Sequence, residues 1–157
     1  KHKLKLIEKG AKRLGINIIE TCLRDGASAD KELPSADRIL CDVPCSGLGV
    51  LSRKPEIRYK DDLIDTDLAD IQYKILCESA KYLKIGGKLV YSTCTLNPQE
   101  NNKNTAKFLA EHNDFEGVEL ELPPELKRAF DEKPYEITLM PHTFDGDGFY
   151  IAVLTRR

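Results

Sequence analysis

Two cysteines in this chain follow predicted strands, in loops whose other residues suit a reactive site. Cys45 lies in residues 42–47 (DVPCSG) and Cys94 lies in residues 92–95 (STCT). Because neighbouring strands lie about 5 Å apart and ligands bind beyond their carboxyl ends, the two thiols can face one pocket, with Asp42 between them. Two thiols in one pocket suit methylation of C5 of a cytosine, in which one thiolate adds to C6 and a second thiol helps the product to leave. A carboxyl group at Asp42 could protonate or hydrogen-bond N3 of the same ring.

The elements that must position these loops alternate between helix and strand. Apolar residues at helical spacing from Leu4 to Leu14, ended by Gly15, predict a first helix, and a second is expected from Asp65 to the pair Gly86-Gly87. Strands are predicted at residues 16–22, 36–42, 88–93, 118–122, 135–140 and 149–154. This order predicts an α/β fold with a parallel sheet and a C-terminal antiparallel hairpin.

A helix-start pattern follows the second cysteine. Asn97 suits an N-cap, Pro98 suits the first helical position, and Glu100 stands where its carboxylate can reach back to the cap. The pattern predicts a helix from Pro98 to about His112. We interpret Asn97 and Glu100 as a capping pair rather than as catalytic residues.

Composition and charge exclude some classes of protein. The chain has 157 residues, of which 41% are hydrophobic, and it has no apolar run near the roughly 20 residues that a membrane helix needs. No signal peptide is visible, and the five unevenly spaced cysteines indicate a reducing compartment, which predicts a cytoplasmic protein. The net charge is −2, but basic residues cluster in the first helix and at Arg53, Lys54 and Arg58, which permits a phosphate-binding face.

The other cysteines have simpler interpretations. Cys41 lies within an apolar strand, and Cys22 and Cys77 are expected to be buried in the core. Cys41 and Cys45 are spaced like a metal-binding pair, but no second pair or nearby histidine follows. The sequence therefore predicts no metal site.

Three segments together resemble a known family. DVPCSGLGVLSRKPEIRY, YSTCTLNPQEN and PHTFDGDGFYIAVL are similar, in that order, to the bacterial Sun (Fmu) group of RNA cytosine-5 methyltransferases. The resemblance implies a Rossmann-like class I methyltransferase sheet. It also implies S-adenosylmethionine-dependent methylation of C5 of a cytidine in small-subunit ribosomal RNA, through a covalent bond between a cysteine and C6.

The resemblance also implies roles for individual residues. By the match, Cys94 is the nucleophile, Cys45 promotes product release, and Asp42 contacts the target base. Asp25 corresponds to an aspartate that contacts the adenine of S-adenosylmethionine, so the expected donor contacts are Asp25, Asp42 and Pro44. The expected RNA contacts are Arg53, Lys54 and Arg58, together with the first helix.

The chain departs from the family pattern at its start. The family places a glycine-rich donor loop and a ribose-binding acid before the helix that begins near Lys3. We therefore expect residues 1–157 to be one partial catalytic domain, truncated at its N-terminus, that binds the donor weakly and is inactive alone. The unpartnered edge of its first strand could allow dimerisation.

Three alternatives stay open. The chain could be a non-catalytic RNA-binding fragment, or a thiol–disulfide protein that uses Cys45 and Cys94. It could also be an amino-methyltransferase, which modifies an exocyclic nitrogen without a thiol. Pro44-Cys45 disfavours the last, because such sites usually carry Pro-Pro-Tyr or a similar sequence after the acid.

Overall fold

A sheet of five strands, with two helices packed on it, forms the body of the computed structural model. The model describes residues 2–28, 33–59, 66–126, 132–143 and 145–157. The described strands are β1 (Ala36–Asp42), β2 (Leu83–Thr93), β3 (Phe115–Gly117), β4 (Glu136–Leu139) and β5 (Phe149–Arg156). The described helices are α1 (His2–Arg13), α2 (Thr66–Ala80) and α3 (Asn102–Glu111), with short 3-10 helices η1 (Leu48–Val50) and η2 (Pro55–Tyr59).

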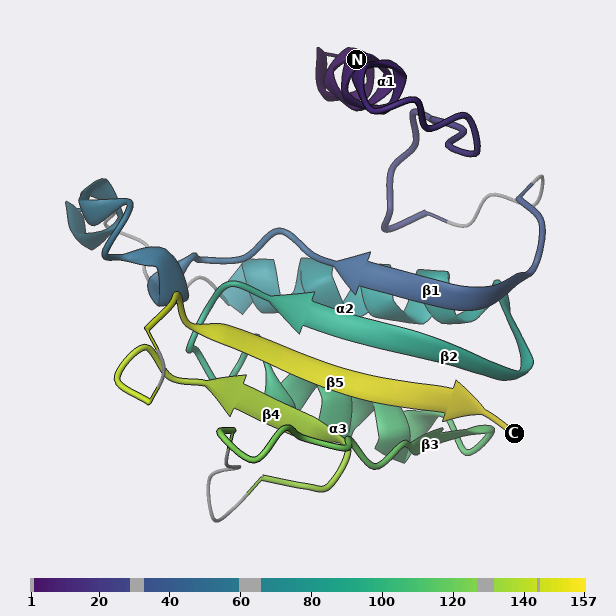
Figure 1. The fold of residues 1–157 in the computed structure, drawn as a ribbon. Helices are drawn as coiled ribbons and strands as arrows, with labels where there is room; N and C mark the ends of the chain where they lie inside the picture. The colour runs from purple at the N-terminus through teal and green to yellow at the C-terminus, as the bar shows by residue number, and fades with distance from the viewer. Residues whose placement is uncertain (1, 29–32, 60–65, 127–131, 144) are drawn as a thin grey trace.

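The strand order confirms the predicted α/β sheet with a C-terminal hairpin. β1 and β2 are parallel, β5 lies antiparallel beside β2, and β3 and β4 both pair with β5. Figure 1 shows α2 and α3 on one face of this sheet. Since side chains alternate across a strand, Tyr150, Ala152 and Leu154 of β5 are all buried. Burying a large apolar side chain contributes about 1.5–3 kcal/mol, so this layer makes a rigid support for the loops at its end.

The N-terminal segment is the main departure from the expected elements. Residues 16–22 form no strand, and Ile18 is 87% exposed. Figure 1 shows α1 and this segment beside β1 but apart from the sheet, and no described strand pairs with that outer edge of β1. An extended segment without a neighbour cannot pair its backbone groups in a ladder, so the strand prediction was wrong here. Cys22, expected in the core, is exposed for the same reason.

The glycine pair was also misassigned. α2 ends at Ala80, and Gly86 and Gly87 lie within β2, which begins at Leu83. The β1–β2 register shifts between Ala36 and Arg38, and Gly86 has a φ of 74°, which a residue without Cβ adopts at little cost. The pair therefore marks an irregularity in a strand, not the end of a helix. Asp65, the expected start of α2, lies outside the described residues.

Two further boundaries differ from the expected ones. β3 occupies Phe115–Gly117, whereas residues 118–122 form no strand, although the Val118 N–H donates to the Val153 carbonyl at 2.8 Å. α3 begins at Asn102 and its N-cap is Asn101, so Asn97 does not cap it. Within the described ranges, none of the helices has the length and apolar character to cross a bilayer.

Candidate active site

The structure brings the two singled-out cysteines into contact. β1 and β2 run in parallel with Asp42 opposite Ser92, so the loops that follow them start side by side. The Sγ atoms of Cys45 and Cys94 lie 2.9 Å apart, and both residues are half-buried. Two thiols at the carboxyl ends of adjacent parallel strands are placed where open α/β sheets bind ligands.

The surroundings of Cys45 keep its thiol protonated. Burial, followed by the hydrogen bond with Cys94, raises the pKa of Cys45 to about 12. At neutral pH the Cys45 S–H is therefore intact and can donate to the sulfur of Cys94.

A buried carboxylate ties the two cysteine loops together. Glu100 is 1% exposed and accepts hydrogen bonds from the Ser46 N–H at 2.9 Å and the Ser46 hydroxyl at 2.6 Å. It also accepts from the Gln72 amide at 2.7 Å and the Asn97 amide at 3.0 Å. Asn97 accepts from the Gln99 N–H at 3.1 Å and contacts Glu100, but in the turn before α3. The Asn97 N–H donates to the Thr95 hydroxyl and not to Glu100, so the prediction that the two residues cap a helix was wrong.

Close backbone packing fixes the far side of the Cys45 loop. The Gly49 N–H donates to the Cys94 carbonyl at 3.0 Å, and the Gly148 N–H donates to the Gly49 carbonyl at 2.7 Å. A Cβ atom on Gly49 would lie 2.0 Å from the Gly148 oxygen and 2.9 Å from the Cys94 oxygen. Glycine is therefore required at position 49, where three loops meet.

Gly49→Ala is expected to destabilise the protein by about 3 kcal/mol, because the new methyl group overlaps two rigid carbonyl groups. A thermal melt followed by circular dichroism measures the loss. Gly10→Ala is the matched control, since nothing lies within 4 Å of a Cβ there. Its expected effect is neutral or slightly stabilising because Gly10 lies in a helix. Equal melting temperatures for Gly49→Ala and the unchanged chain would contradict the packing described.

Asp42 and Pro44 lie beside the thiol pair and are exposed. The Ser92 hydroxyl donates to the Asp42 carboxylate at 3.4 Å. With the sulfurs 2.9 Å apart, no carboxylate fits between them, so the expectation that Asp42 sits between the cysteines was wrong. Asp42 instead ends β1 next to them, with an exposed side chain.

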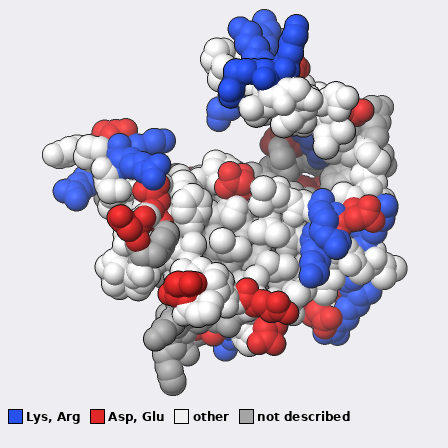
Figure 2. Space-filling model, in the orientation of Figure 1, with Lys and Arg blue, Asp and Glu red and all other residues white. Residues whose placement is uncertain are grey.

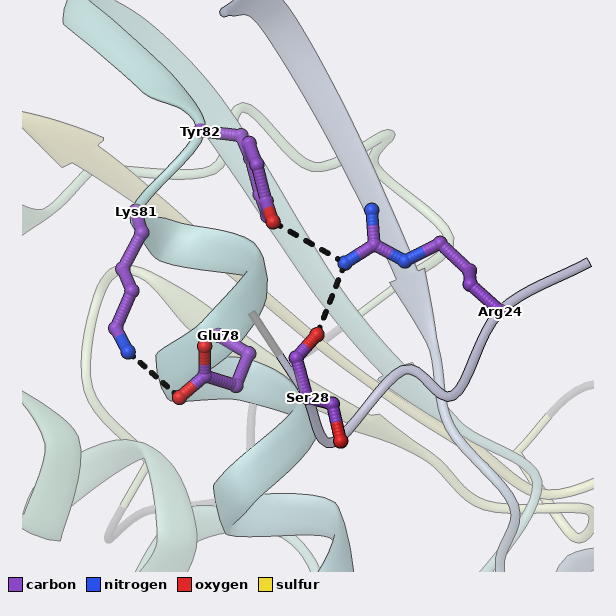
Figure 3. Close-up of polar contacts among 5 residues, drawn as sticks. All are labelled: Arg24, Ser28, Glu78, Lys81 and Tyr82. Carbon is purple, nitrogen blue, oxygen red and sulfur yellow. Dashed lines mark hydrogen bonds and ion pairs between the residues drawn. The ribbon is translucent and has the colours of Figure 1, made fainter. Parts of the chain in front are cut away.

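The surroundings of Asp25 are those of a turn. Its exposed carboxylate accepts from the Ala27 N–H at 3.0 Å and from the Ser28 hydroxyl at 3.1 Å. Figure 3 shows the neighbouring Arg24 donating to the Ser28 carbonyl and to the Tyr82 hydroxyl near the end of α2, at 3.1 and 3.3 Å. A largely apolar cavity of about 410 Å³ adjoins this turn, lined in part by Gly26 and Ile39. Asp25 is thus in contact with its own turn, and the structure gives it no contact with the cysteine loops.

Figure 2 shows basic side chains over α1 and over the loop that holds η1 and η2, on either side of a hollow above β1, and a further group at the opposite end of the sheet. Arg53, Lys54 and Arg58 are exposed in that loop. Arg53 pairs with Asp147 at 3.1 Å, which ties the basic loop to the loop before β5. The predicted RNA-binding residues are therefore together and accessible, on the side of the cysteine loops.

Cys41 and Cys77 contribute to the packing of the core. Cys41 is 4% exposed in the core, and burial raises its pKa to about 11. Cys77 is half-buried and packs against the core from α2. Among the described residues, no group of three or more His, Cys, Asp or Glu side chains is arranged to hold a metal ion.

Comparisons with known proteins agree on one family. Residues 1–155 match the family model described as "16S rRNA methyltransferase RsmB/F". The chain is 42% identical over 163 residues to the "Probable ribosomal RNA small subunit methyltransferase B" of Bacillus subtilis (strain 168), covering 100% of this chain and 36% of that protein. The chain thus spans about a third of the length of that relative.

Two solved structures share the fold. The crystal structure of PH0851 has a TM-score of 0.90 and 31% identity, over 99% of this chain and 35% of that one. NSun6 from Pyrococcus horikoshii, solved with SFG, has a TM-score of 0.85 and 29% identity, over 99% of this chain and 39% of that one.

Proposed function

Because this chain belongs to the 16S rRNA methyltransferase RsmB/F family, we propose that it carries the base-modifying site of an enzyme that methylates C5 of a cytidine in ribosomal RNA. The observation that carries this proposal is the 2.9 Å contact between Cys45 and Cys94. Residues 1–157 belong to one catalytic domain in this account. Pairing of the free edge of β1 with a second copy stays a prediction.

The first step activates the ring. C5 of cytosine is a weak nucleophile, so the Cys94 thiolate adds to C6 and forms an S–C6 bond. The electrons of the C5–C6 double bond shift through C4 to N3, and Asp42, exposed beside the pair, is the group that we assign to hydrogen-bond N3 as its negative charge grows. The base must be unstacked for this, because a sulfur cannot reach C6 from above within a stack.

The second step transfers the methyl group and releases the product. When bound, S-adenosylmethionine would supply the electrophilic methyl group that C5 takes, and the donor sulfur would keep the electron pair of the bond that breaks. A base, which we take to be solvent water, then removes the C5 proton. The electron pair restores the C5–C6 double bond and expels Cys94 as a thiolate. The Cys45 S–H, held against Cys94, stabilises that leaving sulfur.

S-adenosylmethionine is the donor that the methyltransferase family implies, and the three residues that we propose to contact it lie on the surface of the described structure. Asp25, Asp42 and Pro44 are all exposed, and Asp25 uses both carboxylate oxygens within its own turn. They could contact a donor that other residues hold. The isolated 157-residue chain is therefore expected to show no saturable S-adenosylmethionine binding in the micromolar range by titration calorimetry. Micromolar binding would contradict this expectation.

The basic loop is proposed to hold the RNA backbone. Replacing Arg53, Lys54 and Arg58 together by alanine should weaken binding to single-stranded RNA and lower the slope of log affinity against log salt by about 2, at roughly 0.7 per phosphate contact. Filter binding over a salt series measures both quantities. Lys81→Ala with Lys84→Ala is the control, since these lysines pair with Glu78 and Asp37 away from the loop. An unchanged slope in the triple variant would remove the loop from the RNA site.

The activity can be tested in a chimera in which residues 1–157 replace the matching third of the Bacillus subtilis relative. The chimera is incubated with small-subunit ribosomal RNA and labelled S-adenosylmethionine, and the RNA is then digested to nucleosides. The expected product is 5-methylcytidine. Label on the exocyclic nitrogen of cytidine would instead favour an amino-methyltransferase.

A thiol–disulfide function is the second candidate, because sulfurs 2.9 Å apart need little movement to reach a bond of about 2.05 Å. Reversible cycling of Cys45 and Cys94, with no covalent complex on any cytosine analogue, would support it.

A further inference from the structure

We propose that Glu100, together with Gln72, is a positioning residue that holds Cys45 against Cys94. The consequence for product release rests on the proposed function. The positioning itself is a property of the folded chain and can be measured without methyl transfer.

The two peptide groups that flank Cys45 are both held by this pair of side chains. On one side, the Gln72 amide donates to the Pro44 carbonyl at 2.7 Å. On the other side, the Ser46 N–H donates to Glu100 at 2.9 Å. Gln72 also donates to Glu100 at 2.7 Å, so the two contacts form one connected clamp across the cysteine.

Glu100 also belongs to the loop of the other cysteine. It lies in the turn that follows Cys94, and its carbonyl accepts from the buried Tyr91 hydroxyl at 2.6 Å. The Ser46 and Thr95 hydroxyls add a direct contact between the loops at 2.7 Å. Glu100 therefore joins the two loops whose spacing sets the sulfur–sulfur distance.

A carboxylate is required at this position because every partner donates. The Ser46 N–H can only donate. The Gln72 amide also donates to the Pro44 carbonyl, and the Asn97 amide oxygen accepts from the Gln99 N–H, so both amides keep their NH₂ groups toward Glu100. Glu100→Gln keeps the shape but turns an NH₂ group toward these donors, which leaves buried groups unpaired. The Ser46–Thr95 contact does not hold the peptide groups that flank Cys45, so the loop is expected to shift and the two thiols to separate.

Glu136 provides a matched control. It is also a buried glutamate, 3% exposed, and it accepts a hydrogen bond from the Tyr150 hydroxyl at 2.5 Å. It lies in β4 and not beside the cysteine loops. Glu136→Gln should therefore cost stability, as Glu100→Gln does, without moving the thiols.

The experiment is oxidation of the 157-residue chain by diamide, a diazene. Two thiols lose two electrons and two protons to the diazene, which becomes a hydrazine, and the sulfurs form a disulfide. Samples are quenched with an alkylating reagent, and the Cys45–Cys94 disulfide is measured by peptide mass spectrometry. Glu100→Gln is expected to slow its formation about tenfold, whereas Glu136→Gln should stay within about twofold of the unchanged chain.

A second variant tests whether slower disulfide formation could come from loss of the fold. Ser46→Ala removes only the hydroxyl that bonds Glu100 and Thr95, and it is expected to slow the same disulfide by a smaller factor while circular dichroism stays unchanged. Glu100→Gln that crosslinks at the unchanged rate, or Glu136→Gln that slows it equally, would overturn the positioning role.

Two outcomes separate this inference from the proposed function. In the chimera, Glu100→Gln should retain covalent attachment of RNA but release it slowly. If the crosslinking pattern appears as expected but the chimera never attaches RNA, the clamp stands and the methylation proposal fails.

Discussion

Cys94→Ala in the chimera is expected to abolish both methyl transfer and covalent attachment of RNA, with a loss in rate on the order of 10⁴-fold or more. Cys94 follows β2 directly, at the carboxyl end of the sheet, and its sulfur faces the protonated thiol of Cys45. With no sulfur at position 94, C5 of the base is never activated. Transfer of label from S-adenosylmethionine measures the rate, and a denaturing gel detects attached RNA.

Cys77→Ala is the control for this prediction. Cys77 is also half-buried, but it lies on α2 and away from the cysteine loops. Its replacement should leave methylation within about twofold of the unchanged chimera, since large-to-small changes outside the site act mainly on stability. Methylation that survives Cys94→Ala would show that the reaction needs no thiol there.

Cys45→Ala is expected to have the opposite effect on the covalent complex. Attachment through Cys94 should proceed, but release should slow by about 10²- to 10³-fold, within the range that a positioned proton donor contributes. The cause is the loss of the S–H that donates to the departing sulfur. RNA joined to protein should therefore accumulate on a denaturing gel while the yield of methylated RNA per enzyme approaches one.

Cys45→Ser keeps a donor in the same place and should restore part of the release rate. A hydroxyl is a shorter donor than a thiol, so the recovery is expected to be incomplete. Cys45→Ala could instead lose activity without accumulating a covalent complex, as Cys94→Ala is expected to do. That result would contradict the assignment of attack to Cys94 and release to Cys45.

Several elements could be predicted because the structure indicated by their local sequence is also the one that their spatial neighbours stabilise. Residues 36–42 have a short apolar pattern and do form β1, which pairs with β2 and contacts α2 on one face of the sheet. The turn at residues 145–148 separates β4 from β5 as its glycines indicate. The two cysteines could be placed together because both follow strands that were expected to be neighbours, and parallel pairing then brings their loops to one edge.

The misassigned elements depended on partners that a local pattern does not contain. Residues 16–22 have the apolar, β-branched composition of a strand, yet no described strand lies beside them to complete a ladder. Gly86-Gly87 has the composition of a helix end and also of a strand irregularity, and only the register between β1 and β2 distinguishes the two. Local composition therefore indicates which residues suit a strand or a turn, but not which residues they pair with.

The supporting residues of the site could not be predicted for a similar reason. Glu100 sits in a pattern that local rules interpret as a cap, but its four donors come from three separate segments of the chain. The need for glycine at position 49 arises from the approach of Gly148, about a hundred residues later in the sequence. Such contacts exist only once the sheet has formed.

The most direct test of the account is to identify the sulfur that bonds the base. RNA that contains 5-fluorocytidine should become trapped on the chimera, because fluorine at C5 leaves no proton for the release step. Protease digestion and mass spectrometry of the trapped complex should then find the nucleotide on the peptide that carries Cys94, with Cys45 unmodified. A nucleotide found on Cys45, or on neither cysteine, would contradict the assignment of these two neighbouring thiols to attack and release.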